Sequence, residues 1–337
     1  MHLYLAKRLL FICISPKRVL LLFICFALFP VSLSAQKNKA EIPVSIQIKP
    51  KRLVKLPSLV GETSGLLLFD GLLWTINDSD NPAILFGLDT ISGEIVRTVA
   101  VRNSTNTDWE AVTQDESNIY IGDFGNNLGN RTDLRILKIS KATLLNPDTY
   151  TVDAGSIRFR YPDQASFETA YNSNNFDCEA FVYYQDSLHL FSKNWIDLNT
   201  RHYVLPADTG THIAKLAGQF NADGLITDAS VNKSGNLVLL GYKHIRGKKW
   251  KCFCWLTKID SADVSSGSNK IRISLGTAFH LGQTEGIFLT NDNRAWIPSE
   301  SIVAGKLKRR AKLFSLDLKQ ACRHQEAGAY KNDYYKP

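Results

Sequence analysis

The sequence predicts an all-β protein built as a single β-propeller of four-stranded antiparallel blades. Two observations support this prediction. Many short apolar runs, such as GLLLF, LLWTIN and NLVLLGY, are separated by Asn, Asp, Gly and Ser, which is typical of short strands. One local pattern also recurs five times along the chain, and repetition at intervals of about 50 residues is typical of propeller blades. No long segment carries the 3.6-residue period of a large helix.

The recurring pattern is an acidic residue followed by a step from small to apolar residues at the start of a strand. It occurs as ETSGL at 62–66, DWEAV at 108–112, DCEAF at 177–181, TDAS at 227–230 and TEGI at 284–287. The key acids are 48, 69, 49 and 57 residues apart, which favours five blades. Six blades are an alternative, because the 69-residue interval could hold extra strands, and a β-sandwich is the main rival fold.

Each unit divides into strands in the same order. The first strand leads through a tight polar turn, such as Asp70-Gly71, directly into a second apolar strand. Third and fourth strands are predicted at 84–88 with 95–101 in the first unit and at 134–139 with 156–161 in the second. Four antiparallel strands per unit are the content of one propeller blade.

The last unit lacks a clear fourth strand after the strands near Gly286, Trp296 and 313–316. Residues 42–54, IPVSIQIKPKRLV, have the composition of a strand and precede the first unit. We therefore expect this N-terminal strand to complete the last blade. Such an exchange closes the ring and leaves no open sheet edge.

The first residues have the layout of a secretory signal peptide. An apolar run at 19–34 follows the basic pair Lys17-Arg18 and ends in small residues. The run has 16 residues, fewer than the about 20 that a membrane-spanning helix needs, so a cleaved signal is favoured over a membrane anchor. The sequence predicts a secreted or periplasmic protein with three parts: a signal peptide at 1–35, a propeller at 36–320 and a polar tail at 321–337.

The formal net charge is +8, and half of it lies in the predicted leader, which holds four basic residues and no acid. Export would also separate the protein from nucleic acid, so no nucleic acid partner is expected. We expect a monomer without a stable membrane anchor. Its expected partner is a small molecule or an extracellular glycan or protein. Four cysteines follow the leader, and the sequence leaves their disulfide state open: Cys178, Cys252, Cys254 and Cys322.

Propeller topology gathers polar residues from every unit at one end of the ring, called the mouth below. Neighbouring strands run in opposite directions, so first strands begin where second strands end. The starts of the first strands supply Glu62, Asp108, Glu110, Asp177, Glu179, Asp228 and Glu285. The ends of the second strands supply Asn77 and Asp78, Asp123 with Asn126 and Asn127, Lys193 and Asn194, Tyr242 to His244, and Ser299 and Glu300.

Acids crowded around one axis repel one another unless a cation, a proton or a basic side chain neutralises them. Carboxylate oxygens suit Ca²⁺, and the predicted metal ligands are Glu62, Glu110, Glu179, Asp228 and Glu285. Contacts with a bound ligand are expected from Asp78, Asp108, Asp123, Asn127, Asp177, Lys193 and Trp195. Two alternatives stay open: the acids accept backbone N–H bonds that hold the blades together, or they perform acid–base chemistry without metal.

The candidates for a catalytic role are Glu110, Lys193 and His244. No unambiguous base or nucleophile accompanies them, since the chain has no G-x-S-x-G elbow and no His followed by Glu. The sequence therefore favours a secreted binding or scaffold module with an acidic, Ca²⁺-binding mouth. The alternative is a Ca²⁺-dependent hydrolase of phosphoesters, esters or lactones at the same place.

Six segments of the chain resemble secreted bacterial propellers of unknown role, those of the SdiA-regulated and phytase-esterase-like groups. They are ETSGL at 62–66, NDSD at 77–80, DWEAV at 108–112, YIGDFGNN at 120–127, DCEAF at 177–181 and TEGI at 284–287. The resemblance covers residues 55–318 and implies a propeller fold and a secreted location. Calcium-dependent propeller hydrolases are more distantly similar, and the chain does not carry their full ligand pattern.

Overall fold

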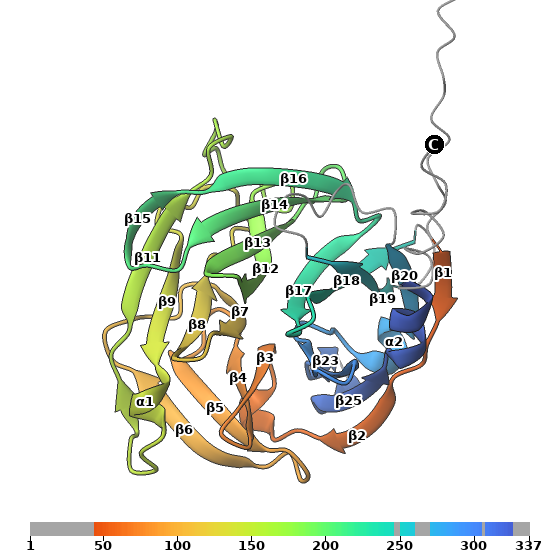
Figure 1. The fold of residues 1–337 in the computed structure, drawn as a ribbon, viewed down its shortest axis with the longest axis horizontal. Coiled ribbons are helices and arrows are strands. Elements are labelled where there is room, and N and C mark those ends of the chain that lie inside the picture. The colour runs from red at the N-terminus through yellow and green to blue at the C-terminus, as the bar shows by residue number, and fades with distance from the viewer. Residues whose placement is uncertain (1–43, 246–249, 260–269, 305–306, 326–337) are drawn as a thin grey trace, which may run out of the picture. The chain divides into compact units, whose positions relative to one another are not determined.

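The computed structural model describes residues 44–245, 250–259, 270–304 and 307–325, and these residues form a five-bladed β-propeller (Figure 1). The predicted fold class is confirmed, with five blades and no sandwich. The long interval between Glu110 and Glu179 contains no extra blade. It holds instead the short helix α1 (Lys141–Leu144), the short strand β10 (Thr151–Val152) and a long connection before the third blade.

The five blades follow one another in chain order, each with its first strand innermost. Blade 1 contains β3 (Thr63–Phe69), β4 (Leu72–Asn77), β5 (Ile84–Asp89) and β6 (Ile95–Val101). Blade 2 contains β7 (Trp109–Gln114), β8 (Asn118–Asp123), β9 (Arg135–Ser140) and β11 (Gly155–Arg160). Blade 3 contains β12 (Asp177–Tyr184), β13 (Ser187–Lys193), β14 (Asn199–Pro206) and β16 (Lys215–Asn221). Blade 4 contains β17 (Leu225–Val231), β18 (Asn236–His244), β19 (Trp250–Lys258) and β20 (Ile271–Thr277).

Blade 5 combines the two ends of the propeller, as the sequence predicts. It contains β21 (Phe288–Leu289), β22 (Arg294–Ser299), β25 (Lys312–Asp317) and β2 (Lys51–Lys55). Strand β2 pairs antiparallel with β25, from Lys51 opposite Ser315 to Lys55 opposite Lys312. The outermost strand of this blade therefore comes from the beginning of the propeller, and its backbone hydrogen bonds hold the ring closed (Figure 1).

Three blades carry a fifth, parallel strand at the outer edge, which the sequence did not predict. These strands are β1 (Val44–Gln47) on β20, β10 on β6 and β15 (Gly210–Ile213) on β11. Smaller elements complete the described chain: the 3-10 turn η1 (Ser58–Val60), helix α2 (Ala278–Leu281), and a hairpin of β23 (Ile302–Ala304) and β24 (Leu307–Arg309). Residues 319–325 are also helical.

Apolar side chains fill the spaces between neighbouring blades. Each of the five interfaces in the described chain has its own cluster, for example Trp74 with Ile121 between blades 1 and 2, and Phe181 with Tyr120 between blades 2 and 3. Both faces of a blade are covered by its neighbours. Because successive side chains of a strand point to opposite faces, apolar residues at odd and even positions fill the two interfaces on either side of the blade. Each large side chain buried in this way stabilises the ring by roughly 1.5–3 kcal/mol.

The tight turns between first and second strands follow their sequence. Asp70 and Gly71 have φ angles of 51° and 73°, as a two-residue turn between antiparallel strands requires. All four cysteines after the predicted leader are buried, and Cys178, Cys252 and Cys254 are free thiols; the fourth is Cys322. Within the described residues, no helix has the length and apolar character needed to cross a bilayer. The signal peptide lies outside the described residues, and it stays a prediction together with the domain boundaries.

Candidate functional site

Backbone bulges position two of the mouth glutamates. In β7 the pairing with β8 shifts register between Trp109 and Ala111, which leaves Glu110 outside the ladder. In β12 the same shift falls between Cys178 and Ala180 and leaves out Glu179. A bulged residue departs from the regular alternation of strand side chains, so a bulge can direct a side chain toward a site. Both glutamates are buried, at 3% and 2% exposure.

The antiparallel pairing of first and second strands brings further polar residues to the same level. Thr63 is opposite Asn77, which directly precedes Asp78, and Trp109 is opposite Asp123. Asp177 is opposite Lys193. The starts of the first strands therefore lie beside the ends of the second strands, as the sequence predicts for the mouth.

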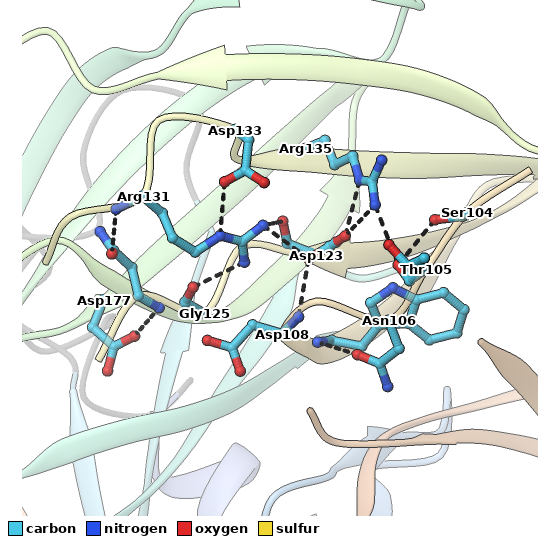
Figure 2. A network of polar contacts seen from close by, with 12 residues as sticks. Ser104, Thr105, Asn106, Asp108, Asp123, Gly125, Arg131, Asp133, Arg135 and Asp177 are labelled. Atoms are coloured by element: carbon cyan, nitrogen blue, oxygen red, sulfur yellow. Dashed lines mark hydrogen bonds and ion pairs between the residues drawn. The ribbon is translucent and has the colours of Figure 1, made fainter. Parts of the chain in front are cut away.

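Asp123 is an acid of this assembly with a complete set of partners (Figure 2). Its Oδ1 accepts the backbone N–H of Asp108 at 3.1 Å and lies 3.0 Å from the guanidinium of Arg131. Its Oδ2 lies 2.8 Å from the guanidinium of Arg135. Arg131 also donates to the carbonyl oxygen of Gly125 at 3.0 Å. Asp123 therefore fixes the loop after β8 and has no oxygen free for a ligand.

Asp177 is also fully paired, and its donors come from two blades. Its Oδ1 accepts the backbone N–H of Asn126 at 2.6 Å. Its Oδ2 accepts the side-chain N–H groups of Asn127 and Trp195, each at 2.8 Å. The bonds from Asn126 and Asn127 join the loop of blade 2 to the first strand of blade 3. This is the structural role that the sequence left open for acids at strand starts.

Two other acids of the predicted metal set have separate surroundings. Asp228 is fully buried, and its Oδ2 accepts the backbone N–H of Ile287 at 2.6 Å, which links blades 4 and 5. Burial raises the pKa of Asp228 well above its usual value, because the charged form loses its hydration. Glu62 is exposed, and its Oε2 accepts a hydrogen bond from the side chain of Asn81 at 2.5 Å.

Five carboxylates of the mouth gather into two overlapping groups of three. The first group consists of Asp78, Asp108 and Glu110, and the second consists of Asp78, Glu285 and Glu300. Within each group, one oxygen of each residue lies within 4.8 Å of the others. Asp78 belongs to both groups, so it stands between blade 2 and blade 5.

These grouped carboxylates have few hydrogen-bond donors. Among the described residues, no group donates a hydrogen bond to the carboxylate of Asp108 or Glu110, and Figure 2 shows the free carboxylate of Asp108 beside the paired Asp123. Among the described residues, the carboxylate of Asp78 accepts only the N–H of the next residue, Ser79, at 2.5 Å. Glu285 accepts the side-chain amide of Gln283 at 2.6 Å.

Burial and mutual repulsion raise the pKa values of the grouped acids. Loss of hydration and the charge of Glu285 raise the pKa of Asp78 to about 6. Loss of hydration and the charge of Asp78 raise the pKa of Asp108 to about 7. The pKa of Glu110 also lies well above its usual value, through burial and the charge of Glu179. Without a cation, this cluster therefore retains protons near neutral pH.

Lys193 is the basic group deepest in the described part of the mouth, at 4% exposure. Its Nζ lies 2.5 Å from Oε1 of Glu179 and 5.0 Å from the ring centre of Trp195. Burial alone would lower the pKa of Lys193, but Glu179, Tyr242 and neighbouring carboxylates raise it well above its usual value. Lys193 thus stays charged and neutralises Glu179, which removes Glu179 from the set of free carboxylates.

Gly125 brings the backbone of the β8–β9 connection against the first group of acids. A Cβ at this position would lie 2.2 Å from Oε1 of Glu110 and 2.4 Å from Oδ2 of Asp108. Any side chain here would displace both carboxylates. The glycine is therefore required by close approach, and its carbonyl is held by Arg131.

The structure separates the residues that the sequence expected to act together. Of the five predicted metal ligands, Glu110 and Glu285 lie in the two groups and share Asp78, while the other three have partners elsewhere: Glu62, Glu179 and Asp228. His244, a catalytic candidate, is exposed at the end of β18, with its ring 4.8 Å from that of Trp250. No contact with the grouped acids is found for it in the described chain.

Sequence reasoning did not assign functions to three residues that shape the site: Arg131, Arg135 and Glu300. Glu300 directly follows a second strand, as Asp78 does. This position could have indicated that Glu300 is a candidate ligand. Arg131 and Arg135 lie after the motif YIGDFGNN, and nothing in their spacing shows that both meet Asp123.

No protein-family model matches the chain, and no curated protein is similar to it in sequence. Solved structures similar to it include the α-L-arabinofuranosidase of Podospora anserina in complex with cellotriose, at 11% identity and TM-score 0.45, covering 82% of this chain and 98% of that one. Another is the mannose phosphorylase MPT-4 of Leishmania mexicana with phosphate, at 12% identity and TM-score 0.44, covering 83% and 91%. A GH43_1 enzyme of Xanthomonas citri has 12% identity and TM-score 0.42, covering 80% and 90%.

These similarities are too weak to carry an argument about activity, and each of the named functions belongs to the other protein. The class of this protein is set by its own strands: it is a β-propeller. The resemblance of its motifs to the SdiA-regulated and phytase-esterase-like groups stays a prediction, since no family model matches.

Proposed function

We propose that the mouth of this propeller binds a divalent cation, with Ca²⁺ as the best fit, and that the protein is a secreted ligand-binding module. One observation carries the proposal. Asp78, Asp108 and Glu110 bring three carboxylates within 4.8 Å of one another, although Asp108 and Glu110 receive no hydrogen bond from any described group. Buried carboxylates without donors are costly, and a cation is the partner that offsets this cost.

The geometry favours calcium over smaller cations. Ca²⁺ takes 6–8 oxygen ligands at 2.3–2.6 Å in flexible arrangements, whereas Mg²⁺ demands an octahedron at about 2.0–2.1 Å. Three oxygens that are each up to 4.8 Å from the others can surround one ion at no more than about 2.8 Å, so small movements bring them to the Ca²⁺ distance. The set contains carboxylates without histidine or thiolate, which disfavours zinc and other softer metals. The remaining ligand positions would be free for water or for an oxygen of a bound molecule.

The proposal is tested by thermal unfolding of the mature protein in EDTA and in a CaCl₂ series. Calcium at about 100 times its Kd should add about 2.7 kcal/mol to the stability, which corresponds to roughly 5 °C for a chain of this size. Asp78→Asn should abolish the increment, because Asp78 belongs to both acid groups. Glu94→Gln is the matched control, since Glu94 is an exposed acid in blade 1. An unchanged melting temperature in calcium would rule out the cation site.

A hydrolase that uses the same mouth is the second candidate, and the pKa of Asp108 supports it. Burial and the charge of Asp78 raise this pKa to about 7, the range in which a carboxyl group can both give and take a proton at neutral pH. Glu110 lies beside it as a second carboxylate, whereas Lys193 is engaged by Glu179 and is a weak candidate for holding an anion.

Turnover of nitrophenyl phosphates, nitrophenyl esters and lactones with and without calcium distinguishes the two functions. The hydrolase hypothesis expects turnover in the parent protein that Asp108→Asn and Glu110→Gln each reduce at least 100-fold. Absence of turnover on all three substrate classes, together with a calcium-dependent melting temperature, leaves the binding module.

A further inference from the structure

We infer that the rim of the mouth over blades 4 and 5 is a docking surface for an anionic lipid membrane. This surface, called the basic rim below, combines four basic side chains with three exposed apolar ones: Lys55, Arg309, Lys312 and Lys251 with Leu59, Trp250 and Phe279. The docking is reversible and superficial, so it differs from a membrane-spanning anchor. It concerns other residues than the proposed cation site and does not depend on that site.

Three segments of the sequence supply the basic rim, and each carries positive charge alone. Residues 49–61 hold four Lys or Arg, residues 243–251 hold five, and residues 301–316 hold five, while none of the three contains Asp or Glu. In a blade, the fourth strand ends at the mouth, and the second and third strands are joined there. The end of β2, the β18–β19 connection and the β22–β25 connection therefore reach the same face of the ring.

Contacts join these segments across the boundary between blades 4 and 5. Lys251 in β19 is opposite Thr277, which directly precedes α2 and its Phe279. Arg309, at the end of β24, donates a hydrogen bond to the carbonyl oxygen of Phe279. The guanidinium carbon of Arg309 also lies 4.4 Å from the centre of the Phe279 ring. The tip of blade 4 and the β23–β24 hairpin of blade 5 are thus parts of one surface.

The basic rim continues from the hairpin to the outer edge of blade 5. Lys312 begins β25 and is directly opposite Lys55 at the end of β2, an arrangement of like charges that destabilises a sheet. Partial burial lowers the pKa of Lys312, and the charges of Arg309 and Arg52 lower it further. No ion pair joins these four residues to an acid in the part of the chain that is described. The fold maintains mutually repelling cations here, which favours an anionic partner.

Exposed apolar side chains stand among these cations. Trp250 is 40% exposed, Phe279 is 50% exposed and Leu59 is 60% exposed. Trp250 begins β19, and Phe279 lies against Arg309. Leu59, in the turn η1, follows Lys55 by four residues. Surfaces of this composition bind membranes, because the cations meet anionic headgroups while the apolar side chains enter the interface.

The apolar side chains favour a lipid surface over a sulfated polysaccharide. Either partner would satisfy the lysines and arginines, but a polysaccharide offers no hydrocarbon in which an exposed leucine can be buried. A bilayer offers both negative charge and hydrocarbon. The elements β2, β19, β23 and α2 lie in one sector of the ring (Figure 1), so a flat surface can meet their mouth ends together.

The first test is co-sedimentation of the mature protein with vesicles in EDTA. Vesicles of phosphatidylcholine with about one third phosphatidylglycerol should bind the protein, and added NaCl should release it. The double variant Arg309→Gln, Lys312→Gln should bind about 25-fold more weakly, because each basic residue near an anionic surface contributes about fivefold. The matched control is Lys233→Gln, Lys258→Gln, which removes the same charge at the opposite end of blade 4. Melting curves show that both variants are folded.

The second test measures insertion of the apolar side chains. Lipids brominated in their acyl chains should quench tryptophan fluorescence of the parent, and most of this quenching should be lost in Trp250→Phe. Phe279→Ser should weaken vesicle binding at least threefold. Ile91→Ser is its control, since Ile91 is 84% exposed in the β5–β6 turn at the end of the ring opposite the mouth.

The outcomes that would overturn the inference are distinct from those for the cation site. Absence of vesicle binding, or equal binding to phosphatidylcholine alone, rejects an anionic membrane as the partner. Binding to heparin without binding to vesicles replaces the lipid by a polyanion. Equal losses in the variants and their controls place the docking surface elsewhere. Because calcium is absent from both assays, these results stand whether or not the mouth binds a cation.

Discussion

Asp108 and Asp177 occupy equivalent places in neighbouring blades, yet their carboxylates differ completely in their partners. Each precedes a first strand or begins it, and each is two residues before a bulged glutamate. Asp177 accepts three hydrogen bonds, whereas the carboxylate of Asp108 accepts none from the described residues. Position in the repeat therefore does not decide whether an acid is structural.

The difference arises from the loop that each aspartate faces. Asp177 faces the β8–β9 loop of the preceding blade, which offers the backbone N–H of Asn126 and the amide of Asn127. Asp108 faces the corresponding place after β4, where Asp78 stands and adds another negative charge. The β8–β9 loop supplies hydrogen-bond donors, and these bonds join blades 2 and 3. The place after β4 supplies another acid, and the resulting pair of carboxylates is stabilised by a bound cation.

The largest expected effect comes from breaking a paired acid. Asp123→Asn removes the charge that neutralises Arg131 and Arg135, and loss of one partner from a buried ion pair costs about 3–5 kcal/mol. The melting temperature in EDTA should fall by roughly 6–9 °C. Asp108→Asn should leave that temperature unchanged or raise it, because it relieves repulsion, and should remove the calcium increment. Equal losses in the two variants would contradict the division into paired and free acids.

An intermediate effect is expected at Gly125. In Gly125→Ala the new Cβ would lie 2.2 Å from Oε1 of Glu110, so the carboxylates of the first group must move. We expect a loss of about 1–3 kcal/mol in EDTA and at least tenfold weaker calcium binding, measured by calorimetry. Gly71→Ala is the control for calcium affinity alone: a φ of 73° strains an alanine there and lowers the stability, but the Cβ has open space and the calcium affinity should equal that of the parent. Unchanged affinity in Gly125→Ala would place the cation elsewhere.

The last expected effect is the pH dependence of the metal-free protein, which is spread over several pH units. The pKa values of Asp78 and Asp108 are raised to about 6 and about 7 in the folded state, against about 4 in the unfolded chain. Between these values the folded state binds more protons, so their stabilising contribution is full below about pH 4 and is lost as the pH rises to 7. The melting temperature in EDTA should fall by a few degrees from pH 5 to 8, and the double variant Asp78→Asn, Asp108→Asn should show a flatter slope. A parent profile that rises over this interval would contradict the raised pKa values.

Much of the architecture could be predicted because it depends on local patterns. The alternating apolar runs, the Asp70-Gly71 turn and the five acid motifs each occur within a few residues of the chain. The missing fourth strand of the last unit and the unused strand at 42–54 together predicted the closure of the ring. The outer parallel strands were missed, because short polar segments such as β15 carry no strand signal of their own.

The sequence by itself determined that acids from several repeats meet at one mouth, since strand direction and order follow from the repeat. Only the tertiary structure decided which acids are neutralised. Arg131 reaches Asp123, Lys193 reaches Glu179, and Glu300 meets Asp78 across the closed ring. These pairings depend on loop conformations and on contacts between residues far apart in the chain, which no local pattern encodes. The free carboxylates are those that the folded ring leaves without a donor.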